Sequence, residues 1–238
     1  MSLLRSLFFQ FYLYISVLCA SILVVLSFPL PYAIKFSIAR NWGQSMLWVG
    51  EKVCNIKFQV EGKENIPLQP SVIMIKHSSV FEAYAQLVVF PQQTWVVKKE
   101  LQWVPIFGWA LNILKAIPIN RKSGRTAVTQ VIEEGKKRLK NGIWITIFPE
   151  GTRMKPGESK KFGISGAILA KSANVKIIPV AHNAEDFWES HKLIKKPGTV
   201  RFCIGRPINT NEKEVREINL EVKEWIDSKM KVISKSHF

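Results

Sequence analysis

A long charge-free stretch near the N-terminus is the feature that most constrains this fold. No charged residue occurs between Arg5 and Lys35, and residues 6–34 are almost entirely apolar. A helix needs only about 20 apolar residues to cross the hydrocarbon core of a bilayer. We therefore expect a membrane segment here, and the sequence leaves open whether it crosses the bilayer or only enters it. A cleaved signal peptide is the alternative, but its apolar region usually covers only about 7–15 residues.

The segment that follows has a different pattern. Pro29 and Pro31 interrupt the first helix, because a proline ring removes a backbone donor. Bulky residues then recur at helical spacing with basic residues among them: Ile34, Ile38, Trp42, Met46, Val49 and Val53, with Lys35, Arg40 and Lys52. This pattern predicts an amphipathic helix at the membrane surface with its basic side chains on lipid headgroups, and a helix facing a soluble core is the alternative. We assign residues 1–55 to a membrane anchor and interfacial helix.

The chain is strongly basic. Its 238 residues include 34 lysines and arginines against 18 acidic residues, which gives a formal net charge of +16. Such an excess favours an anionic partner, which is nucleic acid, membrane phospholipid, or an acidic carrier or substrate. Much of the aromatic content lies in the membrane segment or the predicted core, so we expect anionic membrane lipids and no nucleic acid as partners. Three scattered cysteines have neither the spacing of a metal site nor that of a disulfide framework.

From residue 56 the sequence alternates between short apolar runs and helical periods. The runs are rich in β-branched or aromatic residues, as expected for buried strands, and cover residues 71–75, 94–97, 143–148, 176–181 and 200–205. Helical periods cover residues 125–142 and the segment from Asn211, where Asn211 and Glu214 are candidates to cap the helix. We therefore predict one α/β domain over residues 56–238, with a central, mostly parallel or mixed sheet covered by helices.

Two polar clusters lie at predicted strand ends. The first holds His77 with Glu82 five residues later, and the second is FPEGTR at residues 148–153. Sites of α/β domains commonly lie at such strand ends. Arg153, together with Arg121 at the end of another apolar run, supplies two guanidinium groups that suit a phosphate. The sequence contains no P-loop, no HExxH zinc pair and no GxSxG nucleophile elbow.

These clusters resemble the sequence blocks of the glycerolipid acyltransferase family, and most closely those of the bacterial 1-acyl-sn-glycerol-3-phosphate acyltransferases. The resemblance covers residues 60–205 and rests on four blocks in the family's order, which read here KHSSVFE, VKKE to INR, FPEGTR and IIPVA. It implies transfer of a fatty acyl group from acyl-ACP or acyl-CoA to the sn-2 hydroxyl of lysophosphatidic acid, giving phosphatidic acid. It also implies a bacterial inner (cytoplasmic) membrane location, with the catalytic domain on the cytoplasmic face and no metal or cofactor.

The chemistry of acyl transfer fits these residues. The attacking hydroxyl must lose a proton, and imidazole is the side chain whose ordinary pKa lies nearest neutrality, so we expect His77 to be the general base. Glu82 is expected to accept the other ring N–H and orient the imidazole. By resemblance, Arg121, Glu150, Gly151 and Arg153 hold the acceptor, with the arginines on its phosphate and Glu150 helping to position the glycerol. Thr152 of the same block is a further candidate for substrate binding, and Lys99 is expected to attract the phosphate or the acyl carrier. The chain departs from the family's usual pattern at Glu82, where Asp is usual, and at Lys76, where Asn is more common.

Other interpretations stay open at this point. Ser79 and Glu82 also have the spacing of a capping box, in which Glu82 would only stabilise a helix start. The sequence also allows an acyltransferase for another acceptor, such as lyso-ornithine lipid or glycerol 3-phosphate, or a non-catalytic membrane lipid-binding protein. We expect His182 to be an ordinary polar residue, and Trp103 and Trp109 to line the core or an acyl path.

Overall fold

A seven-stranded sheet forms the centre of the protein, in the order β1-β7-β6-β2-β5-β3-β4. We analysed a computed structural model, which describes residues 2–236 without the Arg121 side chain. The strands are β1 (Ile56–Glu61), β2 (Val72–Ile75), β3 (Gln93–Lys98), β4 (Ile117–Ile119), β5 (Trp144–Ile147), β6 (Ile177–His182) and β7 (Gly198–Ile204). All neighbouring pairs are parallel except β6 and β7, which are antiparallel. The predicted mixed α/β fold is therefore confirmed.

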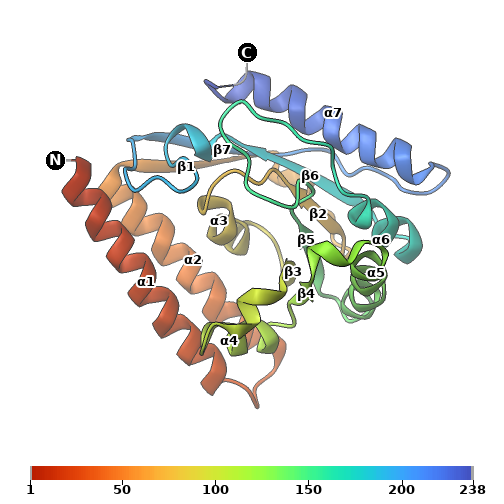
Figure 1. Cartoon of the computed structure of the whole chain (residues 1–238), viewed down its shortest axis with the longest axis horizontal. Coiled ribbons are helices and arrows are strands. Elements are labelled where there is room, and N and C mark those ends of the chain that lie inside the picture. Colours follow the sequence, from red (N-terminus) through yellow and green to blue (C-terminus); the bar gives the residue numbers. More distant parts are fainter. Residues whose placement is uncertain (1, 237–238) are drawn as a thin grey trace.

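Helices cover both faces of the sheet (Figure 1). They are α1 (Ser2–Leu26), α2 (Tyr32–Cys54), α3 (Phe81–Val89), α4 (Phe107–Ile113), α5 (Gly124–Lys140), α6 (Ser165–Ala173) and α7 (Val215–Ile233). Successive side chains of a strand point to opposite faces, so each strand feeds two cores. Ile73 and Ile75 of β2 pack in the core that α1 to α4 share, whereas Val72 and Met74 pack in the core under α5, α6 and α7.

The predicted strands and helices are found where the buried pattern is strong. All five apolar runs form strands, and the period over residues 125–142 is helix α5. The edge strands β1 and β4 were not predicted as strands, because β1 alternates with exposed polar residues and β4 has only three residues. The predicted capping pair of the last helix, Asn211 and Glu214, is wrong, because the helix begins three residues later and Glu214 and Glu217 form the capping box of α7.

The first helix packs along the domain. Its inward face contributes Phe9, Leu13 and Val24 to the core shared with α2 and the sheet. Near its N-terminus, the backbone N–H of Lys195 donates to Ser6 Oγ at 2.9 Å, and Lys195 Nζ donates to Gln10 Oε1 at 2.7 Å. The outward face exposes large apolar side chains at helical spacing, namely Leu4, Phe8, Phe11, Ile15, Leu18 and Ile22. Within the described residues, α1 alone is long and apolar enough to cross a membrane, which is compatible with membrane association.

Helix α2 lies between α1 and α3 and contributes to the core. Met46 and Val49 are buried, as in the alternative of a core-facing helix. Arg40 does not extend to headgroups as predicted, because its guanidinium donates to the carbonyl oxygens of Leu87 and Phe90, which end α3. These hydrogen bonds therefore hold α2 against the C-terminal end of α3.

The apolar surface continues beyond α1. Trp103 and Trp109 are 72% and 56% exposed, so of the two places predicted for them, the core and an acyl path, the core is wrong. They lie on a short 3₁₀ turn (Lys99–Trp103) and on α4, and α4 packs against α1. Both tryptophans are therefore exposed on or next to α4, the helix that packs against α1, and amphipathic rings of this kind suit a membrane interface.

We expect the outward face of α1 to hold the protein on the membrane. Replacing Leu4, Phe8 and Phe11 together with asparagine removes apolar surface that is already exposed, so the protein should leave the membrane fraction with its thermal midpoint nearly unchanged. Phe9→Ala is the matched control on the buried face, and it should cost roughly 3–5 kcal/mol of stability. Fractionation and thermal melts measure both effects, and a triple variant that stays fully membrane-bound would contradict the assignment.

Candidate active site

The two polar clusters of the sequence meet at one edge of the sheet. His77 follows β2 and begins the loop to α3, while Phe148 to Arg153 form the turn after β5. β2 and β5 are parallel neighbours with Met74 paired to Ile147, so the residues beyond their carboxyl ends lie side by side. A hydrogen bond from the Met154 backbone N–H to the His77 carbonyl oxygen, 2.8 Å long, joins the two loops directly.

His77 and Glu82 form a hydrogen-bonded pair. The distance from His77 Nδ1 to Glu82 Oε1 is 2.8 Å. The Glu82 side chain has no exposed surface, and that of His77 is 13% exposed. Because the buried carboxylate can only accept, Nδ1 carries the proton and donates it. In the part of the chain that the structure describes, no group hydrogen-bonds to His77 Nε2, so this atom is free to take a proton.

Glu82 also organises the start of α3. Its carboxylate accepts the backbone N–H groups of Ser78 at 3.1 Å and of Ser79 at 3.0 Å. The other half of a capping box is altered, since Ser79 Oγ accepts the backbone N–H of Phe81 at 3.3 Å and not that of Glu82, while its hydroxyl donates to the carbonyl oxygen of Trp188 at 2.8 Å. The sequence left open whether Glu82 caps the helix or binds the imidazole. In the structure its carboxylate makes both contacts.

A second histidine lies behind the pair, and sequence reasoning missed it. His182 at the end of β6 is fully buried, with Nε2 at 3.6 Å from Glu82 Oε2 and 2.8 Å from the Lys76 carbonyl oxygen. Its Nδ1 accepts the Ala184 N–H at 3.3 Å. The signal in the sequence was its place after the strand IIPVA, because β6 is the other parallel neighbour of β2.

The electrostatics of Glu82 favour its ionised form. Burial by itself raises the pKa of this carboxyl, but the nearby His182 and the hydrogen bond and charge of His77 outweigh burial, so the pKa lies below its ordinary value. An ionised carboxylate at this distance favours the protonated form of the neighbouring imidazole over the neutral form.

The turn after β5 holds the imidazole from its other side. The ring of Phe148 stacks on that of His77, with centroids 4.2 Å apart and planes 24° from parallel. Gly151 has a φ of +71°, a left-handed conformation that favours glycine, and its N–H closes the turn onto the Phe148 carbonyl oxygen at 3.0 Å. Phe148 is a second residue whose contact with the site was not predicted.

The remaining predicted site residues differ in their exposure. Thr152 is exposed and Arg153 is half-buried on the turn, and Lys99 is exposed just after β3 at the same edge of the sheet. Glu150 is different, because its side chain has no exposed surface. Arg121 begins a short 3₁₀ turn after β4, and its side chain lies outside the described part of the structure.

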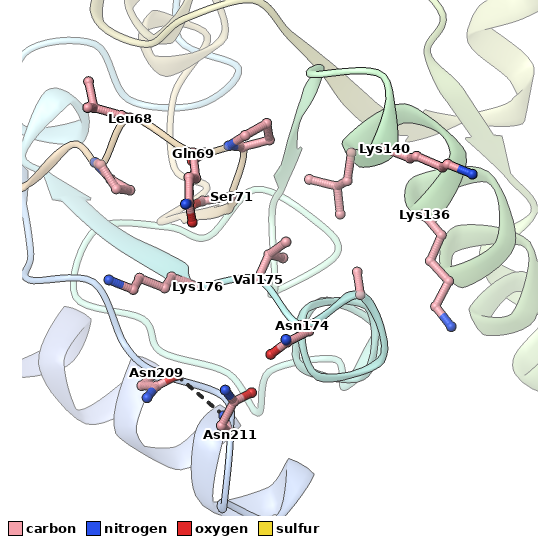
Figure 2. Close-up of a pocket in the computed structure, with 14 residues that line it drawn as sticks. Leu68, Gln69, Ser71, Lys136, Lys140, Asn174, Val175, Lys176, Asn209 and Asn211 are labelled. Carbon is pink, nitrogen blue, oxygen red and sulfur yellow. Dashed lines mark hydrogen bonds between the residues drawn. The ribbon is translucent and has the colours of Figure 1, made fainter.

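A surface cavity of about 970 Å³ lies at the opposite edge of the sheet (Figure 2). It is lined by Ser71 and Lys176, which directly precede β2 and β6, and by residues of α5 and α6. Lys136, Lys140 and Lys176 point away from one another in Figure 2 and do not converge on a common point. This cavity contains none of the predicted site residues.

We expect His182 to support the pair from behind. His182→Ala leaves the buried Lys76 carbonyl oxygen unpaired, which costs about 1–3 kcal/mol, and the cavity adds to this loss. His182→Gln keeps an N–H donor and should lose less stability. The exposed control His191→Asn should stay within about 0.5 kcal/mol of the wild type. Chemical denaturation measures all three, and an unchanged His182→Ala would show that the buried contacts stabilise nothing.

Known proteins resemble this chain in sequence and in fold. The family model described as Acyltransferase matches residues 57–183. A 1-acyl-sn-glycerol-3-phosphate acyltransferase of Pseudomonas aeruginosa is 36% identical over 86% of this chain and 81% of its own length, and a chloroplastic enzyme of the same description from Arabidopsis thaliana is 27% identical over 90% and 62%. The crystal structure of the 1-acyl-sn-glycerophosphate (LPA) acyltransferase PlsC from Thermotoga maritima has a TM-score of 0.82 at 21% identity, covering 97% of this chain and 95% of that one, which shows the shared fold. The chain therefore belongs to the Acyltransferase family.

Proposed function

We propose that this protein transfers a fatty acyl group from a thioester, acyl-ACP or acyl-CoA, to the sn-2 hydroxyl of 1-acyl-sn-glycerol 3-phosphate, giving phosphatidic acid. The observation that carries the proposal is the His77 imidazole, whose Nδ1 is bound to buried Glu82 while Nε2 is free at the edge of the sheet. The names of the Pseudomonas and Arabidopsis relatives support the same reaction and acceptor.

The proposed mechanism needs no covalent enzyme intermediate. Nε2 of His77 accepts the proton of the sn-2 hydroxyl as its oxygen attacks the thioester carbonyl carbon. The new C–O bond forms, the C–S bond breaks, and the imidazolium returns the proton to the departing thiolate. Glu82 keeps the proton on Nδ1 in the resting state and stabilises the positive charge between the two steps.

Cationic side chains at the same edge of the sheet suit the phosphate of the acceptor. Arg153 lies on the turn that contacts His77 through Phe148 and Met154, and its Nε is buried without a hydrogen-bond partner in the described structure. Lys99 is exposed after β3. We propose that Arg153 and Lys99, with Arg121, bind the phosphate, and that the backbone at Gly151 and Thr152 borders the glycerol.

The apolar surface explains how a lipid acceptor would reach this edge. Lys99 begins the 3₁₀ turn that ends at Trp103, this turn packs against α4, and α4 packs against α1. A lysophosphatidic acid molecule in a bilayer could keep its acyl chain in the lipid while its phosphate meets Lys99. We propose that the protein sits on the cytoplasmic face of a bacterial inner membrane, with anionic lipids attracted by the net charge of +16.

The experiment compares turnover of purified full-length variants on detergent-dispersed lysophosphatidic acid with both donors. His77→Ala should lower turnover by about 10²–10⁴-fold with little loss of stability, as expected for a general base. Glu82→Gln should lower turnover too, and Glu82→Asp should retain part of the rate, because it can still accept from Nδ1. His191→Asn is the control and should be fully active.

Acceptors without phosphate complete the same assay. Lyso-ornithine lipid and lysophosphatidic acid should differ in rate, with the phosphate-bearing acceptor preferred. If the wild-type protein turns over neither acceptor, the alternative of a non-catalytic lipid-binding protein replaces the enzyme. Near-normal turnover in His77→Ala would contradict the mechanism even if the activity is present.

A further inference from the structure

A buried ion pair stands directly behind the catalytic pair. Lys76 directly follows β2 and precedes His77, and Glu150 lies in the turn after β5. Because β2 and β5 are parallel neighbours, Lys76 and Glu150 lie close together. Lys76 Nζ is 3.6 Å from Glu150 Oε1, and the two side chains are 1% and 0% exposed. Charges buried to this degree are tolerated only when they are paired.

Lys76 makes a second contact further along the segment that follows β5. Its Nζ donates to the carbonyl oxygen of Glu158 at 2.8 Å. Glu158 belongs to the loop that leaves the FPEGTR turn, and Arg153 lies on this loop between Glu150 and Glu158. The ammonium group thus holds the loop at two points, on either side of Arg153.

Glu150 is more deeply buried than the other residues of the turn after β5 that were predicted to bind substrate. Neither of its carboxylate oxygens has a hydrogen bond of ordinary geometry within the described structure. Its side chain has no exposed surface, while Thr152 is exposed and Arg153 is half-buried. In this conformation the buried carboxylate meets Lys76.

Resting on the function proposed above, we propose that Lys76 and Glu150 are positioning residues, which fix the Arg153 turn relative to His77, and that Glu150 does not itself contact the acceptor. The pair acts through geometry. Because a misplacement of about 1 Å can cost roughly 10²-fold in rate, a loosened turn is enough to weaken both acceptor binding and turnover.

The charges around Glu150 give the pair a pH signature. Burial raises the pKa of Glu150 to about 7, with Lys76 and the backbone N–H groups of Glu150 and His77 acting in the opposite direction and Glu82 adding to the rise. A raised pKa means that folding takes up a proton, so this group's contribution to stability falls as pH rises through about 7. Without Lys76 the pKa rises further, so Lys76→Met should lose stability relative to the wild type increasingly above pH 7.

The test is a double-mutant cycle of Lys76→Met, Glu150→Gln and the double variant, using thermal midpoint, acceptor KM, donor KM and kcat. Each single change leaves one charge buried without its partner, and should raise acceptor KM by about 10-fold to 100-fold while donor KM changes little. The double variant removes both charges, so it should recover part of the midpoint and of acceptor KM, and the remaining loss reflects the missing bond to the Glu158 carbonyl oxygen. Lys76→Arg and Glu150→Asp keep the charges and should lose least.

Two results would overturn the proposal. A double variant that recovers its midpoint but binds acceptor as poorly as Glu150→Gln would show that the carboxylate contacts the acceptor. Strictly additive losses of midpoint, with no extra pH dependence in Lys76→Met, would show that the two residues are not coupled. The midpoints are read without substrate, so they test the pair even if the wild type proves inactive on lysophosphatidic acid, which would refute the proposed function instead.

Discussion

The structure of the site depends on one carboxylate that is held away from water. Glu82 has no exposed surface, and its two oxygens accept from two backbone N–H groups and from Nδ1 of His77. The backbone contacts fix the carboxylate to the residues just before α3, so it cannot follow a moving imidazole. The carboxylate therefore holds the ring through Nδ1 and leaves Nε2 without a hydrogen bond in the described part of the chain. The Glu82 carboxylate thus stabilises the start of α3 and also forms the proposed catalytic pair with His77.

The buried carboxylates of Glu82 and Glu150 lie close together, but their surroundings shift their pKa values in opposite directions. Burial raises the pKa of both carboxyls, but at Glu82 the two imidazoles outweigh burial and the pKa lies below its ordinary value, whereas the pKa of Glu150 rises to about 7 despite Lys76. Such a divergence commonly marks a functional site. The backbone of residues 76–77 connects the two, since it accepts from His182 and Met154 while the Lys76 side chain reaches Glu150.

Much of the fold could be predicted because the central strands are buried on both faces, as the fully buried β2 and β5 illustrate. His77 and Glu82 could be paired from their motif, since only four residues lie between them. His182, Phe148 and the Lys76–Glu150 contact could not be, because each depends on strands that are distant in sequence lying side by side. Arg40 was assigned to headgroups because its charge was visible in the sequence, whereas its carbonyl partners at the end of α3 were not.

The tautomer of His77 tests the central claim most directly. Histidines labelled with ¹⁵N in the full-length protein, with His77→Ala to assign the signals, report which ring nitrogen carries the proton. The structure predicts a neutral ring with the proton on Nδ1 and a bare Nε2, and a loss of this preference in Glu82→Gln. A His77 ring with its proton on Nε2 in the wild type would contradict the account, because that nitrogen could then take no proton from an acceptor hydroxyl.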